Sequence, residues 1–313
     1  MQQKLDWNKL VPFLAAIVFF LAFTLLSGGG MVSSFNLSTL ADQALLLVVG
    51  CCGTIFVAAQ GSVDLSIGVN TALAGVLGAM AYDSTGSFPF MLLVIVAVGC
   101  VIGLFNGFIV GVCKVPSFMA TLALLIGIRG IVNYIQSVWG LSYAPVELVA
   151  LNASGLKFVV LALIVAVMGY IFECTRFGRY CKAIGENETV ARYSGVPVLR
   201  MKMLAYLLSG LMAALASVFL IARLGGTSTT MGSFFEIKVM MSIYVGGVLV
   251  SGGTGSRLYK AIVGAFIVVI IENGLMLLGY SSSQVSESVQ GILLVLILIL
   301  MSYTDRREQQ KRA

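Results

Sequence analysis

The sequence contains no histidine in its 313 residues. This absence excludes Ser-His and Cys-His nucleophile pairs, His-ligated metal and His-ligated haem. A P-loop of the form GxxxxGK(S/T) is also absent, so the chain cannot hold ATP phosphates in the P-loop manner. The six cysteines show neither metal-ligand spacing nor a disulfide framework, and several lie in apolar runs. We therefore expect no catalytic residues, no metal site, no cofactor and no enzymatic activity.

Charge is also scarce. Charged residues make up 10% of the chain and hydrophobic residues 59%, whereas soluble domains have about 25% and about 45–50%. The mean hydropathy is +1.03. These values indicate a polytopic membrane protein. The net charge of +6 is then better explained by basic cytoplasmic loops than by nucleic-acid binding.

Apolar runs near the ~20 residues needed to cross a bilayer recur along the chain. The clear ones are Val11–Leu26, Leu40–Ala59, Pro89–Val112, Leu156–Thr175, Met203–Ala222, Lys260–Leu278 and Val289–Tyr303. Phe118–Gln136 is expected to be a further span, although Arg129 interrupts it. Leu65–Tyr82 and Ile237–Val250 are short or broken by glycine. No A-x-A cleavage site follows the first run, which we interpret as a retained span. The sequence predicts an all-α polytopic membrane protein with eight to ten transmembrane helices, including broken or re-entrant elements, in one domain covering 1–313.

Lysine and arginine predict the orientation. The segment Arg176–Lys202 carries six of them, the tail 304–313 carries four, and Lys4 and Lys9 precede the first span. All three regions are expected to be cytoplasmic, which implies an even number of crossings. The loop Tyr82–Phe88 has no lysine or arginine and fits the outer side.

Two pairs of motifs suggest an internal repeat. Thr85-Gly-Ser87 and Thr254-Gly-Ser256 lie 169 residues apart, and Asn106-Gly107 and Asn273-Gly274 lie 167 apart. In each half a broken apolar segment lies just upstream of these motifs, a pattern typical of a transporter's substrate path. Chance remains an alternative, because the chain has 35 glycines.

A polar segment, AIGENETVARYSGV, stands out near the middle of this apolar chain. Asn187 can cap a short helix, Glu188 favours the positive end of the helix dipole, and Gly195 and Pro197 can end it. A helix of roughly two turns is marginal alone in water, so we expect it to rest on something. The alternative is a basic loop that only sets topology, which would explain neither the caps nor the glutamates.

Asp64 lies between two apolar runs, where a charge at the bilayer centre costs about 2.5–3.5 kcal/mol without a partner. It can cap a helix beginning near Leu65 with Ser66 in the first turn, or mark a discontinuous helix on a translocation path; we favour the cap for Asp64 itself. Polar residues in or near spans could bind a hydroxyl-rich substrate or join helices. The candidates for lining the path are Asp64, Ser66, Asn70, Asn106, Glu272 and Asn273.

Several motifs together resemble a known family. Gly178–Gly195 (GRYCKAIGENETVARYSG) is similar to the central cytoplasmic loop of monosaccharide-importing ABC permeases of the ribose, galactose and xylose type. Further matches follow in family order over about residues 40–303: Gly61–Gly68 (GSVDLSIG), Gly103–Gly107 (GLFNG), Val115–Leu122 (VPSFMATL), Leu207–Ala214 (LLSGLMAA), Ala222–Gly225 (ARLG), Val250–Gly255 (VSGGTG) and Glu272–Leu275 (ENGL). Each motif alone is weak, and the ordered set is specific.

The resemblance implies a multi-pass permease in a bacterial cytoplasmic (inner) membrane with both termini cytoplasmic. Its implied partners are a cytoplasmic ATP-binding subunit, an extracytoplasmic sugar-binding protein, membrane lipid and a second permease chain, identical or different, but no nucleic acid. The loop at about 176–202 would contain the coupling helix that contacts the ATPase. The matching positions are Glu186, Asn187, Glu188, Ala191, Arg192 and Gly195. Glu272 departs from the family, in which many members have a neutral residue.

The rival hypothesis is an ion-coupled secondary transporter or channel that uses Asp64 and Glu272 as ion or proton sites. It gives no role to the capped cytoplasmic helix. An intramembrane enzyme is disfavoured because no clustered Ser/Lys or paired-carboxylate motif is present. The sequence does not name the sugar, and furanoses and nucleosides stay open as substrates.

Overall fold

The computed structural model describes residues 7–280, 288–289, 291–292, 295 and 299. These residues form helices and loops without a strand. The helices are α1 Trp7–Leu26, η1 Gly30–Val32, α2 Ser34–Ala59, α3 Ile67–Thr85, α4 Phe88–Gly111, α5 Ser117–Trp139, α6 Val146–Ala153, α7 Leu156–Cys174, α8 Arg176–Glu186, α9 Glu188–Tyr193, α10 Val198–Leu224, α11 Phe235–Val245 and α12 Leu258–Leu277. The prediction of an all-α polytopic membrane protein is confirmed.

Six of the described helices are long and apolar enough to cross a membrane, namely α2, α4, α5, α7, α10 and α12. The apolar part of α1, Pro12–Leu26, is shorter. The segment Leu65–Tyr82, predicted to be short or broken, lies largely in α3, and the segment Ile237–Val250 includes most of the 11-residue α11. The predicted span Val289–Tyr303 and the tail 304–313 lie largely or wholly outside the described residues.

The helices begin where the sequence offers caps. Ser33 accepts a hydrogen bond from the Asn36 amide at the start of α2, and Ser87 accepts one from the Phe90 amide at the start of α4. Such caps satisfy amides that the first helical turn leaves without partners. The loops before α2 and α4 therefore end at defined residues.

Helix α4 packs along α10 in the most extensive helix pair of the described chain. Gly99, Gly103 and Gly107 line one face of α4, and a side chain at any of them would collide with the α10 backbone or with Ala214. Gly210 gives α10 the matching close approach. In lipid, small residues at four-residue spacing let helix backbones come close enough for dispersion contacts to hold them together. These glycines therefore set the α4–α10 contact.

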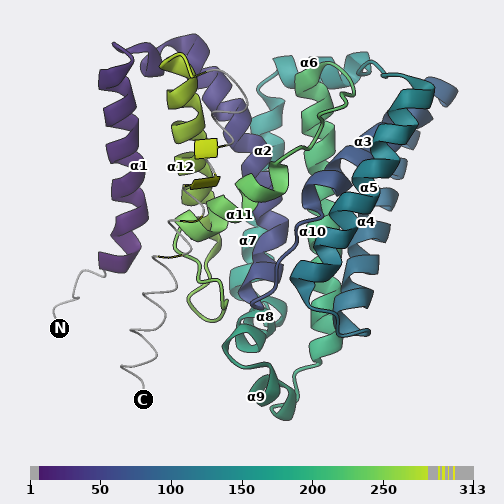
Figure 1. Ribbon diagram of the computed structural model, residues 1–313, viewed down its shortest axis with the longest axis vertical. Helices are drawn as coiled ribbons and strands as arrows, with labels where there is room; N and C mark the ends of the chain where they lie inside the picture. Colours follow the sequence, from purple (N-terminus) through teal and green to yellow (C-terminus); the bar gives the residue numbers. More distant parts are fainter. Residues whose placement is uncertain (1–6, 281–287, 290, 293–294, 296–298, 300–313) are drawn as a thin grey trace.

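The suspected repeat has a structural counterpart of inverted topology. Helix α2 runs toward the end of the molecule that carries α9, whereas α10 starts beside α9 and runs away from it (Figure 1). The helix contacts match in the same way. In one half α3 packs on α4, and in the other α11 packs on α12. Helix α10 contacts α3 and α4, and α2 likewise contacts α11 and α12. The two halves thus place α3 and α11 at equivalent central positions.

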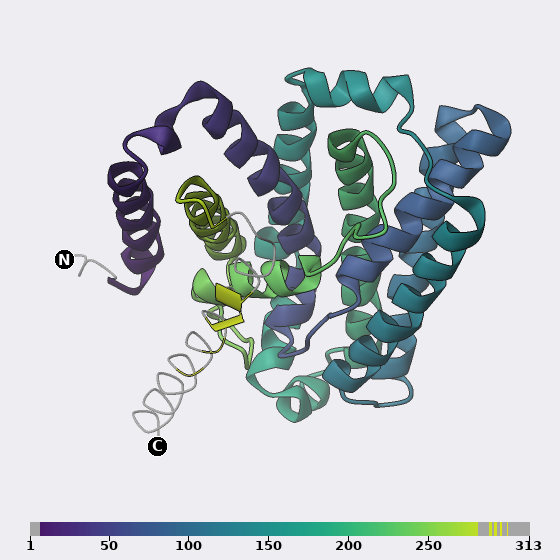
Figure 2. The same ribbon diagram turned by 45° about the horizontal axis from the view of Figure 1, so that its top comes forward.

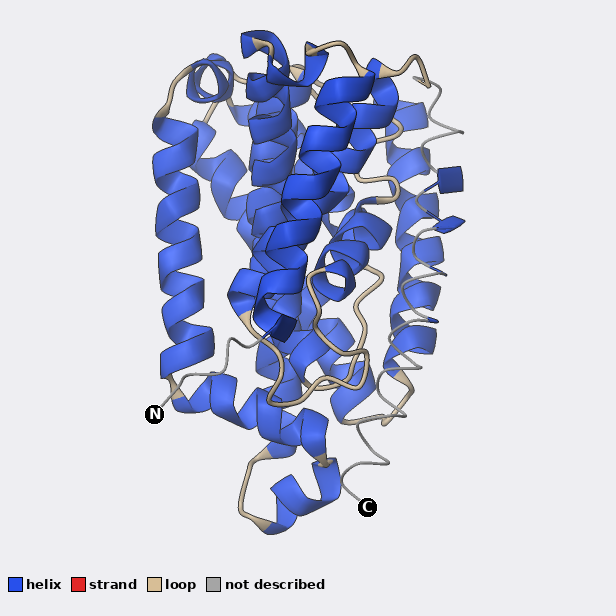
Figure 3. Cartoon of the chain, turned by 90° about the vertical axis from the view of Figure 1, so that its left-hand side faces the viewer, coloured by secondary structure: helices blue, strands red, loops and turns tan. Residues whose placement is uncertain are grey.

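The two ends of the bundle differ. Helices α8 and α9 project beyond one end, and α6 lies at the other (Figures 1 and 3). Helix α11 lies inside the bundle at mid-height, among the longer helices (Figure 2). It is preceded by the non-helical residues 225–234 and followed by 246–257. Irregular backbone at membrane depth is tolerated where protein encloses it or where it lines a cavity.

Candidate functional site: a docked helix pair and an internal cavity

The polar middle segment forms two helices, α8 and α9. The Asn187 side chain accepts a hydrogen bond of 3.0 Å from the Val190 amide and caps α9. Gly195 has φ +83°, which favours glycine, and α10 begins directly after Pro197. Ala191 is buried on the inner face of α9. The predicted short capped helix is confirmed, and it rests on the start of α10.

Helix α8 contacts the end of α2 and the loop before α12, one segment from each half of the suspected repeat. A side chain at Gly185 would collide with the Ala59 carbonyl and the Gly253 amide, so α8 touches the end of α2 and the loop before α12. Glu186 accepts hydrogen bonds from the amide and hydroxyl of Thr254, at 2.8 and 2.6 Å. The Gln60 side-chain amide donates to the Cys181 sulfur at 3.1 Å. These contacts tie α8 to the segments that lead into α3 and out of α11.

A second link is ionic. Glu173, at the end of α7, pairs with Lys182 of α8 at 2.7 Å and with Arg257 at 2.8 Å. It also accepts a hydrogen bond of 3.1 Å from the Leu258 amide at the start of α12. One carboxylate therefore joins α7, α8 and α12. Charge-assisted bonds of this kind are among the stronger ones available to a side chain.

Glu188 joins α9 to α10. Its carboxylate pairs with Arg192 at 3.0 Å and with Lys202 at 2.7 Å. The hydrogen bond from Lys202, helped by Arg192, holds the pKa of the Glu188 carboxyl below its ordinary value. The carboxylate therefore stays charged at neutral pH, and α9 keeps a fixed position against α10.

The outer face of α9 carries apolar groups that the sequence reasoning missed. Val190 is 59% exposed and Tyr193 is 89% exposed, on a helix that projects beyond the bundle. Tyrosine at an exposed tip is typical of contact sites, because its ring offers much area at little entropic cost. The sequence signal was an apolar residue and an aromatic three positions apart in a helix otherwise polar on its outer side.

The Asp64 segment forms a buried polar cluster at the break between α2 and α3. Asp64 is 2% exposed. One carboxylate oxygen accepts from the Ser66 amide and hydroxyl at 3.0 and 2.7 Å, and the other accepts from the Ser209 hydroxyl of α10 at 2.6 Å. Asn106 of α4 donates to the Ser66 hydroxyl at 2.7 Å. Asp64, Ser66 and Asn106 thus lie together, and both Asp64 oxygens are used in joining helices.

Asn70 lies one turn further along α3 and donates to the Gly99 carbonyl of α4 at 3.3 Å. The side-chain oxygens of Asn70 and Asn106 are buried and have no partner among the described residues. Buried acceptors of this kind normally find a partner, protein or water. Both asparagines face the α3–α4 contact, far along the chain from the other two predicted path residues.

Those two residues, Glu272 and Asn273, lie on α12. Glu272 forms an ion pair with Lys238 of α11, and both side chains are mostly buried. Asn273 is 2% exposed, and its side-chain oxygen has no partner among the described residues. The predicted set is therefore divided between a polar cluster at the α2–α3 break and a position beside α11.

The Lys238–Glu272 pair lines a cavity of about 230 Å³, which we call the α11 cavity. Its walls come from α2, α10, α11, α12 and the segment between α10 and α11. The lining residues are Gln43, Leu46, Leu47, Leu220, Arg223, Leu224, Ser228, Thr230, Met231, Gly232, Ser233, Phe235, Lys238, Val269 and Glu272. The Gln43 side-chain oxygen has no partner among the described residues. The cavity thus combines apolar walls with charged, amide and hydroxyl groups.

The family model described as "Branched-chain amino acid transport system / permease component" matches residues 35–298. The chain belongs to this family. The fructose import permease of Rhizobium meliloti is 32% identical over 93% of this chain and 84% of its own length. The xylose transport system permease of Escherichia coli K12 is 28% identical, over 97% and 94%. The ribose import permease of the same strain is 29% identical, over 88% and 86%.

These matches confirm the resemblance to monosaccharide-importing ABC permeases. The chain is a membrane-spanning permease component of an import system, and the rival hypothesis of an ion-coupled transporter or channel is not favoured. Its relatives are transport subunits rather than enzymes. No solved structure matches the chain.

Proposed function

We propose that this permease imports a monosaccharide or a similar small polyol through a bacterial inner membrane, driven by ATP hydrolysis on a separate cytoplasmic subunit. The relatives named for fructose, xylose and ribose import support the substrate class. A soluble sugar-binding protein delivers the substrate at the end that carries α6. The chain acts as a single transmembrane domain beside a second permease chain, with both termini cytoplasmic.

The structure of helix α9 is the observation that supports a contact with the ATPase. It is capped at Asn187, held to α10 through Glu188, and presents Val190 and Tyr193 to solvent beyond the bundle. A short helix held this firmly, with an apolar outer face, fits a groove on a partner protein. We assign coupling to Glu186, Asn187, Glu188, Ala191, Arg192 and Gly195, and add Val190 and Tyr193 as the docking contacts.

The contacts of α8 support a route for the mechanical step. Movement of α9 would shift α8, which is bonded to Thr254 through Glu186 and to Arg257 through Glu173. Thr254 and Arg257 belong to the loop between α11 and α12. A displaced loop would move these helices, and with them the walls of the α11 cavity.

The α11 cavity supports a place on the substrate path. Its volume of about 230 Å³ is below the ~300–1,000 Å³ of sites for drug-sized ligands, as expected for a small substrate. Gln43, Lys238 and Glu272 offer donors and acceptors to hydroxyl groups, and Phe235 and Leu220 offer apolar walls to C–H faces. Asp64, Ser66, Asn70 and Asn106 border this path as helix-joining groups, whereas Glu272 contacts the substrate.

The test is co-purification of the cognate ATPase from detergent extracts. The variant Val190→Asp/Tyr193→Ala changes only exposed groups of α9. Tyr143→Ala is the matched control, because Tyr143 is 87% exposed at the opposite end and Tyr193 is 89% exposed. Wild type and the control should retain the ATPase, and the double variant should lose it while eluting as a folded protein.

Two outcomes would contradict the proposal. If the double variant retains the ATPase as wild type does, α9 is not the docking helix. If wild type is stably alone and transports a sugar in liposomes on an ion gradient, transport does not depend on an ATPase.

A further inference from the structure

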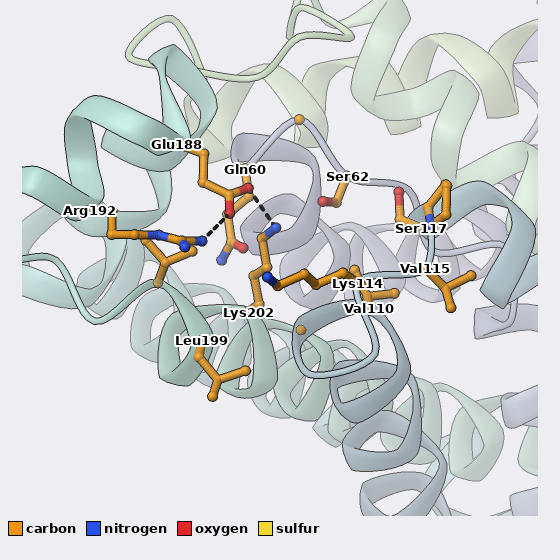
Figure 4. A pocket seen from close by; sticks show the side chains of 14 residues that line it. Gln60, Ser62, Val110, Lys114, Val115, Ser117, Glu188, Arg192, Leu199 and Lys202 are labelled. Carbon is orange, nitrogen blue, oxygen red and sulfur yellow. Dashed lines mark hydrogen bonds and ion pairs between the residues drawn. The ribbon is translucent and has the colours of Figure 1, made fainter.

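A second cavity, of about 450 Å³, lies between α9 and the bundle; we call it the α9 cavity. Its walls are the α2–α3 break, the α4–α5 loop, α9 and the start of α10. The lining residues are Gln60, Gly61, Ser62, Val110, Gly111, Lys114, Val115, Pro116, Ser117, Glu188, Arg192, Val198, Leu199 and Lys202 (Figure 4). It lies within the size range of small-molecule sites. The proposed transport function assigns coupling to Glu188 and Arg192 in its wall, but it gives the cavity itself no ligand.

The charges in the α9 cavity do not balance. Three cations line it, Lys114, Arg192 and Lys202, against the single carboxylate of Glu188. Glu188 already pairs with both Arg192 and Lys202. Lys114 makes no hydrogen bond or ion pair with the rest of the described chain, and its side chain extends toward Lys202 (Figure 4). The Lys202 side chain is only 16% exposed, whereas Lys114 and Arg192 are exposed to solvent.

The backbone at Lys114 adds an independent observation. Its φ is +56°, in the left-handed region that non-glycine residues rarely adopt. Glycine would occupy this position without strain, yet the chain places a lysine there. Strained non-glycine residues cluster at ligand sites, where the side chain is retained for what it contacts. Here the strained residue is also the cation without a partner.

From this arrangement we propose that the α9 cavity binds a phosphate group, held by Lys114 and Lys202. A dianionic phosphate matches the net charge of +2, and the Ser62 and Ser117 side chains in the wall offer neutral donors. The group could be carried by a soluble phosphate ester or by an anionic lipid at the membrane surface, which offer the same chemistry. A bound phosphate competes with Glu188 for Lys202 and so loosens the contact between α9 and α10. The site therefore lets an anion on this face weaken coupling.

The test uses the purified full-length permease in a non-ionic detergent, without an ATPase, so that its outcome is independent of transport. The midpoint of thermal unfolding is measured against inorganic phosphate at pH 7.5, with chloride at equal ionic strength as reference. Wild type should be stabilised saturably. Lys114→Gly removes the cation and relieves the strained φ, so it should fold at least as well as wild type. Its half-saturating phosphate concentration should be about tenfold higher or more.

The matched control is Arg200→Gln, which removes an equal charge from an exposed position on α10 outside the cavity. It should respond to phosphate as wild type does. An equal response in wild type and Lys114→Gly, or no saturable response at all, would overturn the proposal.

Nanodiscs distinguish the two sources of phosphate. In phosphatidylcholine discs, Lys114-dependent stabilisation by inorganic phosphate supports a soluble ligand. In phosphatidylglycerol discs, Lys114-dependent stabilisation by the lipid, with loss of the response to added phosphate, supports a headgroup.

Discussion

At the scale of single residues, the fold treats its two conspicuous carboxylates differently. Asp64 accepts three hydrogen bonds, two from Ser66 just before α3 and one from Ser209 of α10, and none of these donors carries a charge. Glu272 instead pairs with Lys238 in the wall of the α11 cavity. A carboxylate satisfied on both oxygens serves to join helices, whereas an ion pair in a cavity wall still has free hydrogen-bonding capacity for a ligand.

The first prediction concerns Asp64. Asp64→Leu should lower the stability of the folded permease by roughly 1–3 kcal/mol, because it leaves the buried hydroxyls of Ser66 and Ser209 without their acceptor. Asp64→Asn keeps an acceptor and should cost clearly less. The measurement is thermal unfolding in detergent. Equal midpoints for wild type and Asp64→Leu would show that the cluster does not hold the α2–α3 break.

The second prediction concerns the Lys238–Glu272 pair. Glu272→Met alone leaves Lys238 unpaired and should destabilise the protein. The double variant Lys238→Met/Glu272→Met should recover most of that stability, because an apolar pair of similar volume replaces the ion pair. Transport with the ATPase in liposomes should nevertheless stay strongly reduced. Unfolding and uptake are measured on the same preparations, and normal uptake by the double variant would remove Glu272 from the substrate path.

At the scale of elements, α8 and α9 act as a unit with distinct faces. The outer face of α9 is free for a partner, and α8 is bonded to the loop between α11 and α12. Attachment and transmission should therefore be separable. Helix α9 would decide whether the ATPase binds, and the α8 contacts would decide whether its movement reaches the cavity.

The third prediction tests this separation. Glu186→Ala/Thr254→Val removes the two hydrogen bonds that Thr254 of the α11–α12 loop donates to Glu186 of α8. The ATPase should still co-purify, while the sugar transported per ATP hydrolysed falls about tenfold, within the usual range of coupling energies. The control is Thr189→Val, an exposed change on α9. Loss of the ATPase from the double variant would mean that attachment and transmission share the same residues.

At the scale of the whole molecule, the inverted repeat explains the two central helices. Because α2 and α10 run in opposite directions and pack on equivalent partners, α3 and α11 approach each other near the middle. Gly68 and Gly232 are in backbone contact there, where a side chain on either would collide with the other segment. The α11 cavity lies next to this junction, as expected for a binding site at a repeat interface.

The fourth prediction concerns orientation. If the α9 end is cytoplasmic, a membrane-impermeant maleimide should not label wild type in right-side-out vesicles, although Cys113 and Cys174 are exposed at that end. Ser84→Cys places a thiol in the exposed last turn of α3, at the opposite end, and should be labelled. In inside-out vesicles, wild type should be labelled. Labelling of Cys113 in right-side-out vesicles would reverse the assignment.

The sequence by itself determined the features that depend on local chemistry. Apolar runs predict membrane helices because a bilayer admits few other structures. Asn187, Gly195 and Pro197 predict the limits of α9 because caps act within one turn. The tertiary structure decided what depends on distant contacts. It gave Asp64 its partner on α10, paired Glu272 with Lys238, and placed the strained Lys114 and Lys202 in the wall of one cavity. Lys238 and Glu272 are 34 residues apart in the sequence, and Asp64 and Ser209 are 145 residues apart. Such contacts follow from helix packing in space, which no local pattern encodes.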